Sequence, residues 1–290
     1  MPEFSAEHLD LFFGDVSQAV CRVYARYIAS PGEPGLQLSG TLTGPTCAYA
    51  ATLPATSKLV DRGPGGPPLA EAVVPEPCFW TPEMPHWYQV RVQLQQGGKL
   101  LFETVRIFGI RPLGAAGTRL RFDAKNWVLR GVTTEELTES VLQEAHEADA
   151  ALIIRDPSDQ VCEAASRIGV LLAAELETAE LAGFRRLSRW PAVGIASLPA
   201  GAAPRLDGLR HNLLLAERFA AGERVAPSPW ADLAICDVMG EGGLEVGELK
   251  IPMIARRALP SWRSLAEARS GCDRLQGDLA HVGQFAGYIV

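Results

Sequence analysis

The stretch Leu120-Arg-Phe-Asp-Ala-Lys-Asn-Trp-Val-Leu-Arg-Gly-Val132 marks a change in the character of the chain. Before it, short segments alternate apolar and polar residues, which is typical of half-buried antiparallel strands. After it, continuous apolar runs alternate with helical or loop segments, as in parallel strands that are buried on both faces. The sequence therefore predicts two domains, a β-rich domain over residues 1–115 and an α/β domain over residues 116–290, with this stretch as the connecting hairpin.

The first domain is predicted to be an antiparallel β-sandwich. Its clearest signal is a hairpin in which two alternating segments flank the turn Gln96-Gly97-Gly98-Lys99. Glycine at both central positions suits the tight turns that join neighbouring antiparallel strands. Several short strands in about 110 residues are typical of a sandwich. The predicted strands span residues 19–29, 36–43, 88–95 and 100–108.

The second domain carries eight apolar runs, which indicate eight parallel strands and a (β/α)8 barrel. A typical barrel has about 250 residues, whereas this part of the chain allows only about 20 residues for each strand and its connection. Several helices must therefore be reduced to turns. An open doubly wound sheet of five or six strands is the alternative. The runs span residues 127–130, 150–154, 170–174, 192–198, 212–216, 233–237, 251–255 and 285–290.

Composition argues against several classes of function. The 290 residues carry a formal net charge of −7, which does not fit the basic surface of a nucleic-acid-binding protein. No apolar run approaches the length of about 18 residues that would span a membrane, and the chain starts without a basic segment followed by an apolar one. We therefore expect no nucleic acid or membrane partner, and a cytoplasmic location.

No metal or cofactor is expected. The six cysteines form no Cys-x-x-Cys pair and have no histidine at ligand spacing, so they are predicted to be buried free thiols. The cluster Gly240-Glu-Gly-Gly243 lacks the Lys-Ser/Thr of a phosphate-binding loop and is predicted to be a loop only.

Three motifs in order resemble glycoside hydrolase family 2, the family of β-galactosidases, β-glucuronidases and β-mannosidases. Phe79-Trp-Thr-Pro-Glu-Met-Pro-His-Trp-Tyr88 is similar to the family's Leu-Trp-Ser-Pro-Glu-Asn-Pro followed, after two further residues, by Tyr. Phe108-Gly-Ile-Arg111 is similar to Phe-Gly-Phe-Arg, and the stretch 120–132 to Phe-x-Leu-Asn-Gly-Lys-Pro-Val-Phe-Leu-Arg-Gly-Val. The resemblance implies an immunoglobulin-like sandwich followed by a shortened (β/α)8 barrel.

The resemblance continues into the barrel but loses the family's catalytic residues. Arg155, Gly169 and Glu175 fit the second and third strand units, although the family's Ser-His-Tyr and Asn-x-His segments are absent. Gly201 falls at the position of the general acid, after a strand similar to the family's fourth. Arg257 falls at the position of the nucleophile, because Arg256 and Arg257 replace the family's Thr-Glu.

A retaining glycosidase needs one carboxyl group as general acid and a second as nucleophile. Glycine offers neither proton nor lone pair, and arginine stays cationic. We therefore expect a non-catalytic relative that acts as a carbohydrate-binding or assembly module. The alternative is an active glycosidase that uses relocated carboxylates, with Glu175 and then Asp237 as the best candidates. The carboxylates near predicted strand ends are Asp156, Glu175, Glu177, Glu217, Asp237 and Glu241.

The candidate ligand-binding residues are Arg155, Asp156, Glu175, Arg256 and Arg257. Strand alternation predicts that Arg256 and Arg257 face opposite ways, so that one of the two guanidiniums reaches the barrel mouth. That guanidinium would pair with Glu217, Asp237 or Glu175, or would bind an anionic small ligand through a bidentate fork. The partners expected are carbohydrate or such an anion, together with a second copy of the chain or another protein. The sequence leaves open whether the apolar cluster Leu9, Leu11, Phe12 and Phe13 packs on this chain or on a partner.

Overall fold

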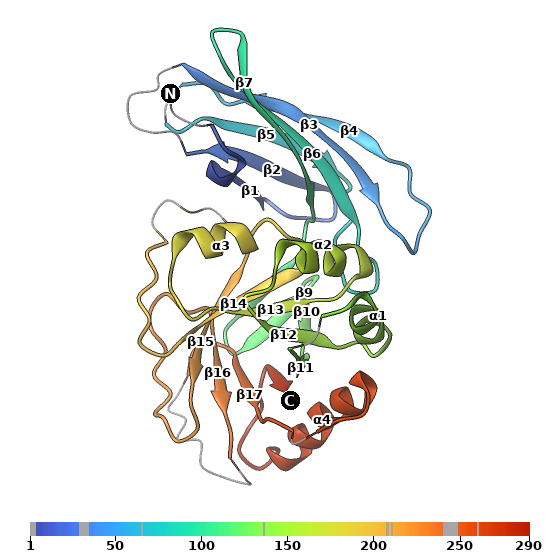
Figure 1. Cartoon of the computed structure of the whole chain (residues 1–290), viewed down its shortest axis with the longest axis vertical. Helices are drawn as coiled ribbons and strands as arrows, with labels where there is room; N and C mark the ends of the chain where they lie inside the picture. The colour runs from blue at the N-terminus through green and yellow to red at the C-terminus, as the bar shows by residue number, and fades with distance from the viewer. Residues whose placement is uncertain are drawn as a thin grey trace. The chain divides into compact units, whose positions relative to one another are not determined.

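The computed structural model describes residues 4–28, 35–64, 66–135, 137–206, 209, 211–239, 249–259 and 261–290. Contacts divide the chain into two compact units, and Figure 1 shows the elements of each. Unit 1 comprises Met1–Arg111 with two later segments, Phe184–Pro191 and Leu206–Asn212. Unit 2 comprises Pro112–Gly183, Ala192–Arg205 and Leu213–Val290. The pattern of apolar residues does not predict the two later segments of unit 1.

Unit 1 is built on a seven-stranded antiparallel sheet in the order β1-β2-β5-β4-β3-β6-β7. Strand β4 pairs with β5 and with β3, so it joins two halves whose inward side chains share one core. This is the strand order of a seven-stranded immunoglobulin-type sandwich. The elements are η1 (Ala6–His8), β1 (Leu9–Gly14), β2 (Val20–Tyr27), β3 (Leu36–Thr46), β4 (Ala55–Asp61), β5 (Leu69–Pro75), β6 (Trp87–Gln96) and β7 (Lys99–Phe108).

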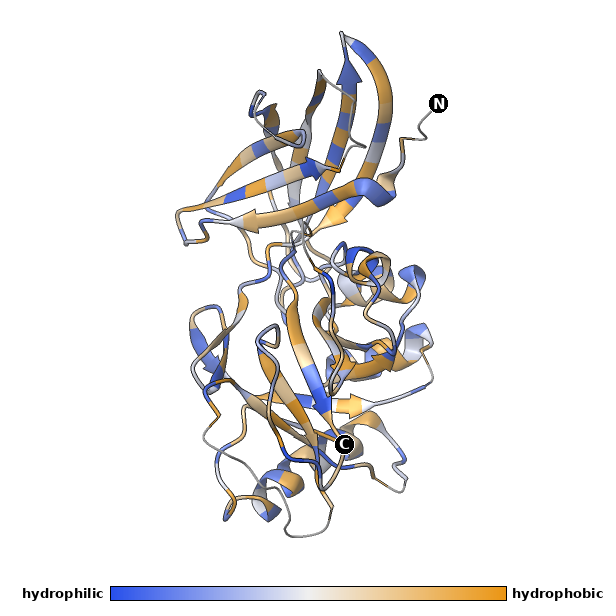
Figure 2. Ribbon diagram, turned by 90° about the vertical axis from the view of Figure 1, so that its left-hand side faces the viewer, coloured by the Kyte–Doolittle hydropathy of each residue, from blue (hydrophilic) through white to orange (hydrophobic). Residues whose placement is uncertain are grey.

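The four predicted strands of the sandwich are confirmed as β2, β3, β6 and β7, and bands of alternating hydropathy are visible along the strands in Figure 2. Strands β1, β4 and β5 were not predicted. Strand β1 lies within residues 1–18 and pairs along its length with β2. Its Leu9 and Leu11 are buried in the core of unit 1, so this apolar cluster packs on its own chain.

Unit 2 contains a closed barrel of eight parallel strands, and all eight predicted strands are present. Pairing of β11 with β18 closes the barrel, so the open-sheet alternative is wrong. A three-stranded sheet of β8 (Leu113–Ala116), β9 (Arg119–Phe122) and β10 (Lys125–Trp127) contains the predicted hairpin. The barrel strands are β11 (Leu129–Thr133), β12 (Ala151–Arg155), β13 (Leu172–Glu175), β14 (Val193–Pro199), β15 (Leu214–Phe219), β16 (Leu233–Asp237), β17 (Met253–Arg256) and β18 (Gly287–Ile289).

Few helices follow the barrel strands, as the length of this part of the chain predicts. Helix α1 (Glu139–Glu147) follows β11, α2 (Asp159–Ile168) follows β12, α3 (Leu181–Leu187) follows β13 and α4 (Leu265–Asp278) follows β17. Gly169 ends α2 in the left-handed conformation, with φ of 92°. Within the described residues, the connections from β14 to β17 contain no helix. The barrel is therefore a reduced version of the (β/α)8 architecture.

Substitution of Gly40 on β3 tests how closely this strand packs against β6. A Cβ atom built there would lie 1.9 Å from the backbone oxygen of Arg91 on β6. We expect Gly40→Ala to cost about 3 kcal/mol of unfolding free energy, because backbone cannot move aside as a side chain can. Gly14→Ala is the matched control, since its Cβ would meet Tyr24 at an ordinary 3.5 Å. Urea unfolding followed by circular dichroism measures both, and equal stabilities would contradict the packing described.

Candidate functional site

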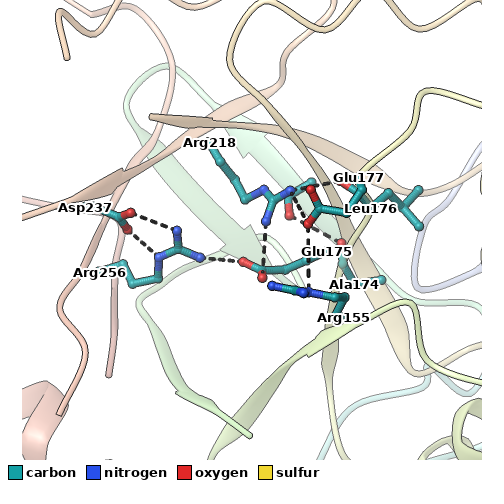
Figure 3. A network of polar contacts seen from close by, with 9 residues as sticks. Arg155, Ala174, Glu175, Leu176, Glu177, Arg218, Asp237 and Arg256 are labelled. Atoms are coloured by element: carbon teal, nitrogen blue, oxygen red, sulfur yellow. Dashed lines mark hydrogen bonds and ion pairs between the residues drawn. The ribbon is translucent and has the colours of Figure 1, made fainter. Parts of the chain in front are cut away.

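Charged side chains gather at the carboxyl ends of the barrel strands, where (β/α)8 enzymes place their active sites. Arg155, Glu175, Asp237 and Arg256 are the last residues of β12, β13, β16 and β17. Arg218 is one residue before the end of β15. Because all eight strands are parallel, these ends meet at one rim, and Figure 3 shows the five side chains in a single polar network.

Arg256 is the centre of this network. Its Nη1 donates to Oε1 of Glu175 at 2.5 Å, and its Nη2 donates to Oδ2 of Asp237 at 3.0 Å. Its Nε donates to Oδ1 of Asp237, which completes a bidentate fork. Burial lowers the pKa of Arg256, but the hydrogen bonds and charges of Asp237 and Glu175 outweigh this and raise the pKa above its ordinary value. The guanidinium is thus a permanent cation held between two carboxylates.

Arg218 extends the network on the other side of Glu175. Its Nη1 lies 3.2 Å from Oε2 of Glu175. Its Nη2 donates to the backbone oxygen of Leu176 at 2.9 Å and lies 3.5 Å from Oε1 of Glu177. The same Glu177 oxygen lies 3.8 Å from Nε of Arg155. The result is a chain of alternating charges, here named the mouth ladder: Arg155, Glu177, Arg218, Glu175, Arg256 and Asp237. Its three cations and three anions balance.

The two consecutive arginines point in different directions, as alternation predicts. Arg256 makes ion pairs with Glu175 and Asp237, two of the three partners expected for the guanidinium at the mouth. Nη1 of Arg257 instead lies 2.6 Å from Oδ2 of Asp278, at the end of α4. The candidate ligand-binding residues therefore do not all lie together. Arg155, Glu175 and Arg256 meet in the mouth ladder, whereas Arg257 forms an ion pair with Asp278 of α4.

Gly201, which the resemblance placed at the general-acid position, lies just after β14 and contacts Glu217. Its backbone N–H donates to Oε1 of Glu217 at 3.0 Å. Glu217 is 1% exposed and also accepts from the Ser228 backbone at 2.6 Å and the Ser228 hydroxyl at 3.1 Å. Alternation places Glu217 on the side of β15 opposite to Arg218. This carboxylate therefore binds the loops around β15 and does not join Glu175.

Two further candidates remain, Asp156 and Glu241. Asp156 is exposed, and its backbone N–H donates to the backbone oxygen of Glu175 at 3.0 Å. Glu241, with the cluster Gly240–Gly243, lies outside the described residues. Conversely, the sequence list of binding residues omitted Arg218. The charged pair Glu217-Arg218 at the end of an apolar run was the available signal, because charge is costly in a buried strand unless it is paired.

A cavity of about 720 Å³ adjoins the mouth ladder. Asp237 and Arg256 line it, together with Thr133 at the end of β11 and Arg257 after β17. Most of the remaining lining is apolar and comes from segments that follow β16, β17 and β18. These residues are Val238, Met239, Ala258, Leu259, Trp262 and Val290, with Ala221 after β15. Loop residues after strands carry no hydrophobic period, so the sequence pattern does not reveal them.

The cysteine thiols contribute little to the chemistry of the site. All six cysteines are free; four are buried, as predicted, whereas Cys47 and Cys78 are half-buried. Burial raises the pKa of the Cys21 and Cys236 thiols to about 12, which keeps them protonated and unreactive.

Among the described residues, no group of three or more His, Cys, Asp or Glu side chains is placed to hold a metal ion. None of the described helices has the length and apolarity needed to cross a membrane.

Residues 44–111 match the family model of glycosyl hydrolases family 2. This match contains two of the three motifs on which the resemblance was based, so the resemblance is confirmed. A comparison with curated protein sequences finds no match.

Solved structures of family 2 glycoside hydrolases share the fold of this chain. A family 2 member from Bacteroides cellulosilyticus DSM 14838 is 14% identical with a TM-score of 0.66, over 99% of this chain and 45% of that one. Parabacteroides merdae β-glucuronidase is 14% identical with a TM-score of 0.58, over 100% and 47%. Bacteroides uniformis β-glucuronidase 2, covalently bound to cyclophellitol-6-carboxylate aziridine, is 15% identical with a TM-score of 0.61, over 97% and 45%. This chain spans less than half the length of these three proteins.

The mouth ladder makes a prediction about stability. We expect Arg256→Leu to lower the unfolding free energy by about 2 kcal/mol, because it leaves the Glu175 and Asp237 charges without their shared partner. Arg257→Leu is the matched control. Its ion pair with Asp278 is more exposed, and we expect a loss below about 1 kcal/mol. Urea unfolding measures both variants, and a larger loss for Arg257→Leu would show that the ladder is not the stronger interaction.

Proposed function

We propose that this protein is a non-catalytic relative of glycoside hydrolase family 2 that binds carbohydrate at the mouth of its barrel. The proposal is carried by one observation, the ion pairs that Arg256 makes with both Glu175 and Asp237. The fold supports a relationship to the family's hydrolases, and the site supports the loss of their chemistry.

The hydrogen bonds of Glu175 leave it unsuited to either catalytic role. A general acid must carry a proton on one oxygen, and a nucleophile needs a free lone pair directed at the anomeric carbon. Both oxygens of Glu175 face guanidinium N–H groups, Oε1 that of Arg256 and Oε2 that of Arg218. The permanent charge of Arg256 also disfavours the oxocarbenium-like transition state of glycoside cleavage.

The geometry favours Arg256 over Arg257 as the residue at the nucleophile position. The alignment of Pro252 with the family's proline assigns that position to Arg257. However, Arg257 pairs with Asp278 of α4, whereas Arg256 reaches the strand ends that carry the ladder. Either assignment puts a cation where the family has a carboxylate, so the functional conclusion is the same.

A second candidate function is glycoside hydrolysis by Glu175 and Asp237. One observation favours it: both carboxylates contact the same guanidinium. They therefore lie within the separation of about 5–10 Å that pairs of glycosidase carboxylates use. Movement of Arg256 would be required before either carboxylate could react, which is why we rank this function second.

We extend the proposal to the role that a carbohydrate-binding protein of this kind would have. Binding without cleavage fits a module that recognises carbohydrate or contributes to an assembly, with a second copy of the chain or another protein as partner. The expected cytoplasmic location stays a prediction.

We expect no release of 4-nitrophenol from 4-nitrophenyl glucoside, galactoside, mannoside or glucuronide above the rate shown by the Glu175→Gln variant. The reason is that Glu175 and Asp237, the two carboxylates considered for catalysis, are both held by guanidinium groups. Absorbance of nitrophenolate after alkaline quenching measures the rate. Cleavage by the unmodified protein that Glu175→Gln abolishes would contradict the proposal and establish the second function.

A further inference from the structure

Two segments of chain that lie between barrel strands belong to unit 1. Phe184–Pro191 lies between β13 and β14, and Leu206–Asn212 lies between β14 and β15; they are called here the first and second inserted segments. Strand β14 begins at Val193 and β15 at Leu214, each just after an inserted segment ends. The two strands are neighbours in the barrel. Contacts that hold the inserted segments in unit 1 therefore also set where both strands start.

Arg111 is hydrogen-bonded to the last residue of each inserted segment. Its Nη1 donates to the backbone oxygen of Pro191, and its Nη2 donates to the backbone oxygen of Asn212 at 3.0 Å. Arg111 is buried, and burial lowers the pKa of its guanidinium to about 9, which shows how unfavourable the position is for a cation. The two carbonyl oxygens offset part of this cost. The guanidinium is thus a buried link between the two segments.

Gly109 packs closely against the first inserted segment. A Cβ atom built at Gly109 would lie 2.6 Å from Cβ of Pro191 and 3.1 Å from Cβ of Trp80. Trp80 is fully buried, and its backbone N–H donates to the backbone oxygen of Ile110 at 2.9 Å. The chain just before Arg111 therefore fits Pro191 with no room for a side chain, which is a second and independent attachment of this segment.

Strand β1 is held by both inserted segments as well. Oδ1 of Asp10 accepts from Nε of Arg185 in the first segment at 3.0 Å, and its Oδ2 accepts from Nη2 of Arg26 on β2 at 2.5 Å. The side-chain amide of Asn212 accepts from the Phe13 N–H at 2.8 Å and donates to the Phe13 carbonyl oxygen at 3.0 Å. Because β1 is an edge strand, this amide takes the place of a neighbouring strand.

We infer that Arg111 and Asn212 form a clamp that couples the stability of the sandwich to that of barrel strands β14 and β15. While the sandwich is intact, both strands start from anchored residues, and when the sandwich is perturbed, both starts are released together. The effect reaches the barrel mouth, because β15 carries Glu217, which holds the neighbouring loops, and Arg218 of the mouth ladder. The inference does not depend on the proposed function, since it involves no ligand.

Hydrogen exchange of the whole protein at increasing urea concentrations, measured by mass spectrometry of peptides, tests the clamp. Peptides from β6 report on the sandwich, and peptides from β14 and β15 report on the barrel strands. Independent domains lose their protection in separate transitions, whereas coupled ones lose it together. We expect all three strands of the unmodified protein to lose protection at the same urea concentration. We expect Gly40→Ala, which perturbs the packing of β3 on β6, to lower the midpoints of all three equally.

Arg111→Met removes both hydrogen bonds of the clamp and keeps a long side chain. In this variant we expect the amides of β14 and β15 to exchange about tenfold faster without urea, and those of β6 to change by less than about twofold. Adding Gly40→Ala to Arg111→Met should lower the midpoint of β6 alone. Arg22→Met is the matched control, because it removes a guanidinium of unit 1 that pairs with Asp15 and Glu71. It should leave the transitions coincident.

Two further variants replace any that fail to fold. Asn212→Ala removes the hydrogen bonds to Phe13 and takes the place of Arg111→Met, with the same expected separation of the transitions. Val23→Ala truncates a buried core residue of β2 and takes the place of Gly40→Ala, with the same expected loss in all three strands.

Three results would overturn the inference. The first is a separate transition for β6 in the unmodified protein. The second is an effect of Gly40→Ala that stays within β6 while Arg111 is present. The third is a set of coincident transitions that persists in Arg111→Met.

Discussion

The ion pairs of the Arg256 guanidinium determine the electrostatics of the barrel mouth. The guanidinium joins the ends of β13, β16 and β17 by donating to Glu175 and Asp237, and Arg218 brings in β15 through the other oxygen of Glu175. Removing carboxylates and guanidiniums from water is costly unless each finds a partner. The alternating order of the mouth ladder provides those partners. The same pairing that stabilises the rim also occupies the carboxylates that a glycosidase would need.

A barrel with few helices must cover its strands in another way. Within the described residues, β14, β15 and β16 are connected without helices. Glu217 holds the two loops around β15 together, through Gly201 on one side and Ser228 on the other. The indole of Trp230 adds a second link by donating to the backbone oxygen of Ala202 at 3.0 Å. A buried carboxylate and an aromatic side chain thus tie together the loops beside strands that lack a covering helix.

The sequence predicts the elements of this structure better than it predicts the site. Continuous apolar runs identify all eight barrel strands, because a strand buried on both faces leaves no other pattern. Strands such as β4, Ala-Thr-Ser-Lys-Leu-Val-Asp, lack that signal, because few of their residues face the core. Alternation correctly predicts that Arg256 and Arg257 diverge. The choice of Glu175 and Asp237 as partners depends on the register and closure of the barrel, which bring residues 175, 237 and 256 together. The same holds for the cavity, whose loop residues follow no period.

The proposed function requires that neither Glu175 nor Asp237 act as a nucleophile. A cyclophellitol-type aziridine, the class of reagent found covalently bound in the Bacteroides uniformis enzyme, tests this by forming a stable bond to a glycosidase nucleophile. The measurement is the intact mass of the protein after prolonged incubation, followed by peptide mapping. The account predicts an unchanged mass. A gain of one reagent equivalent on Glu175 or Asp237 would contradict it.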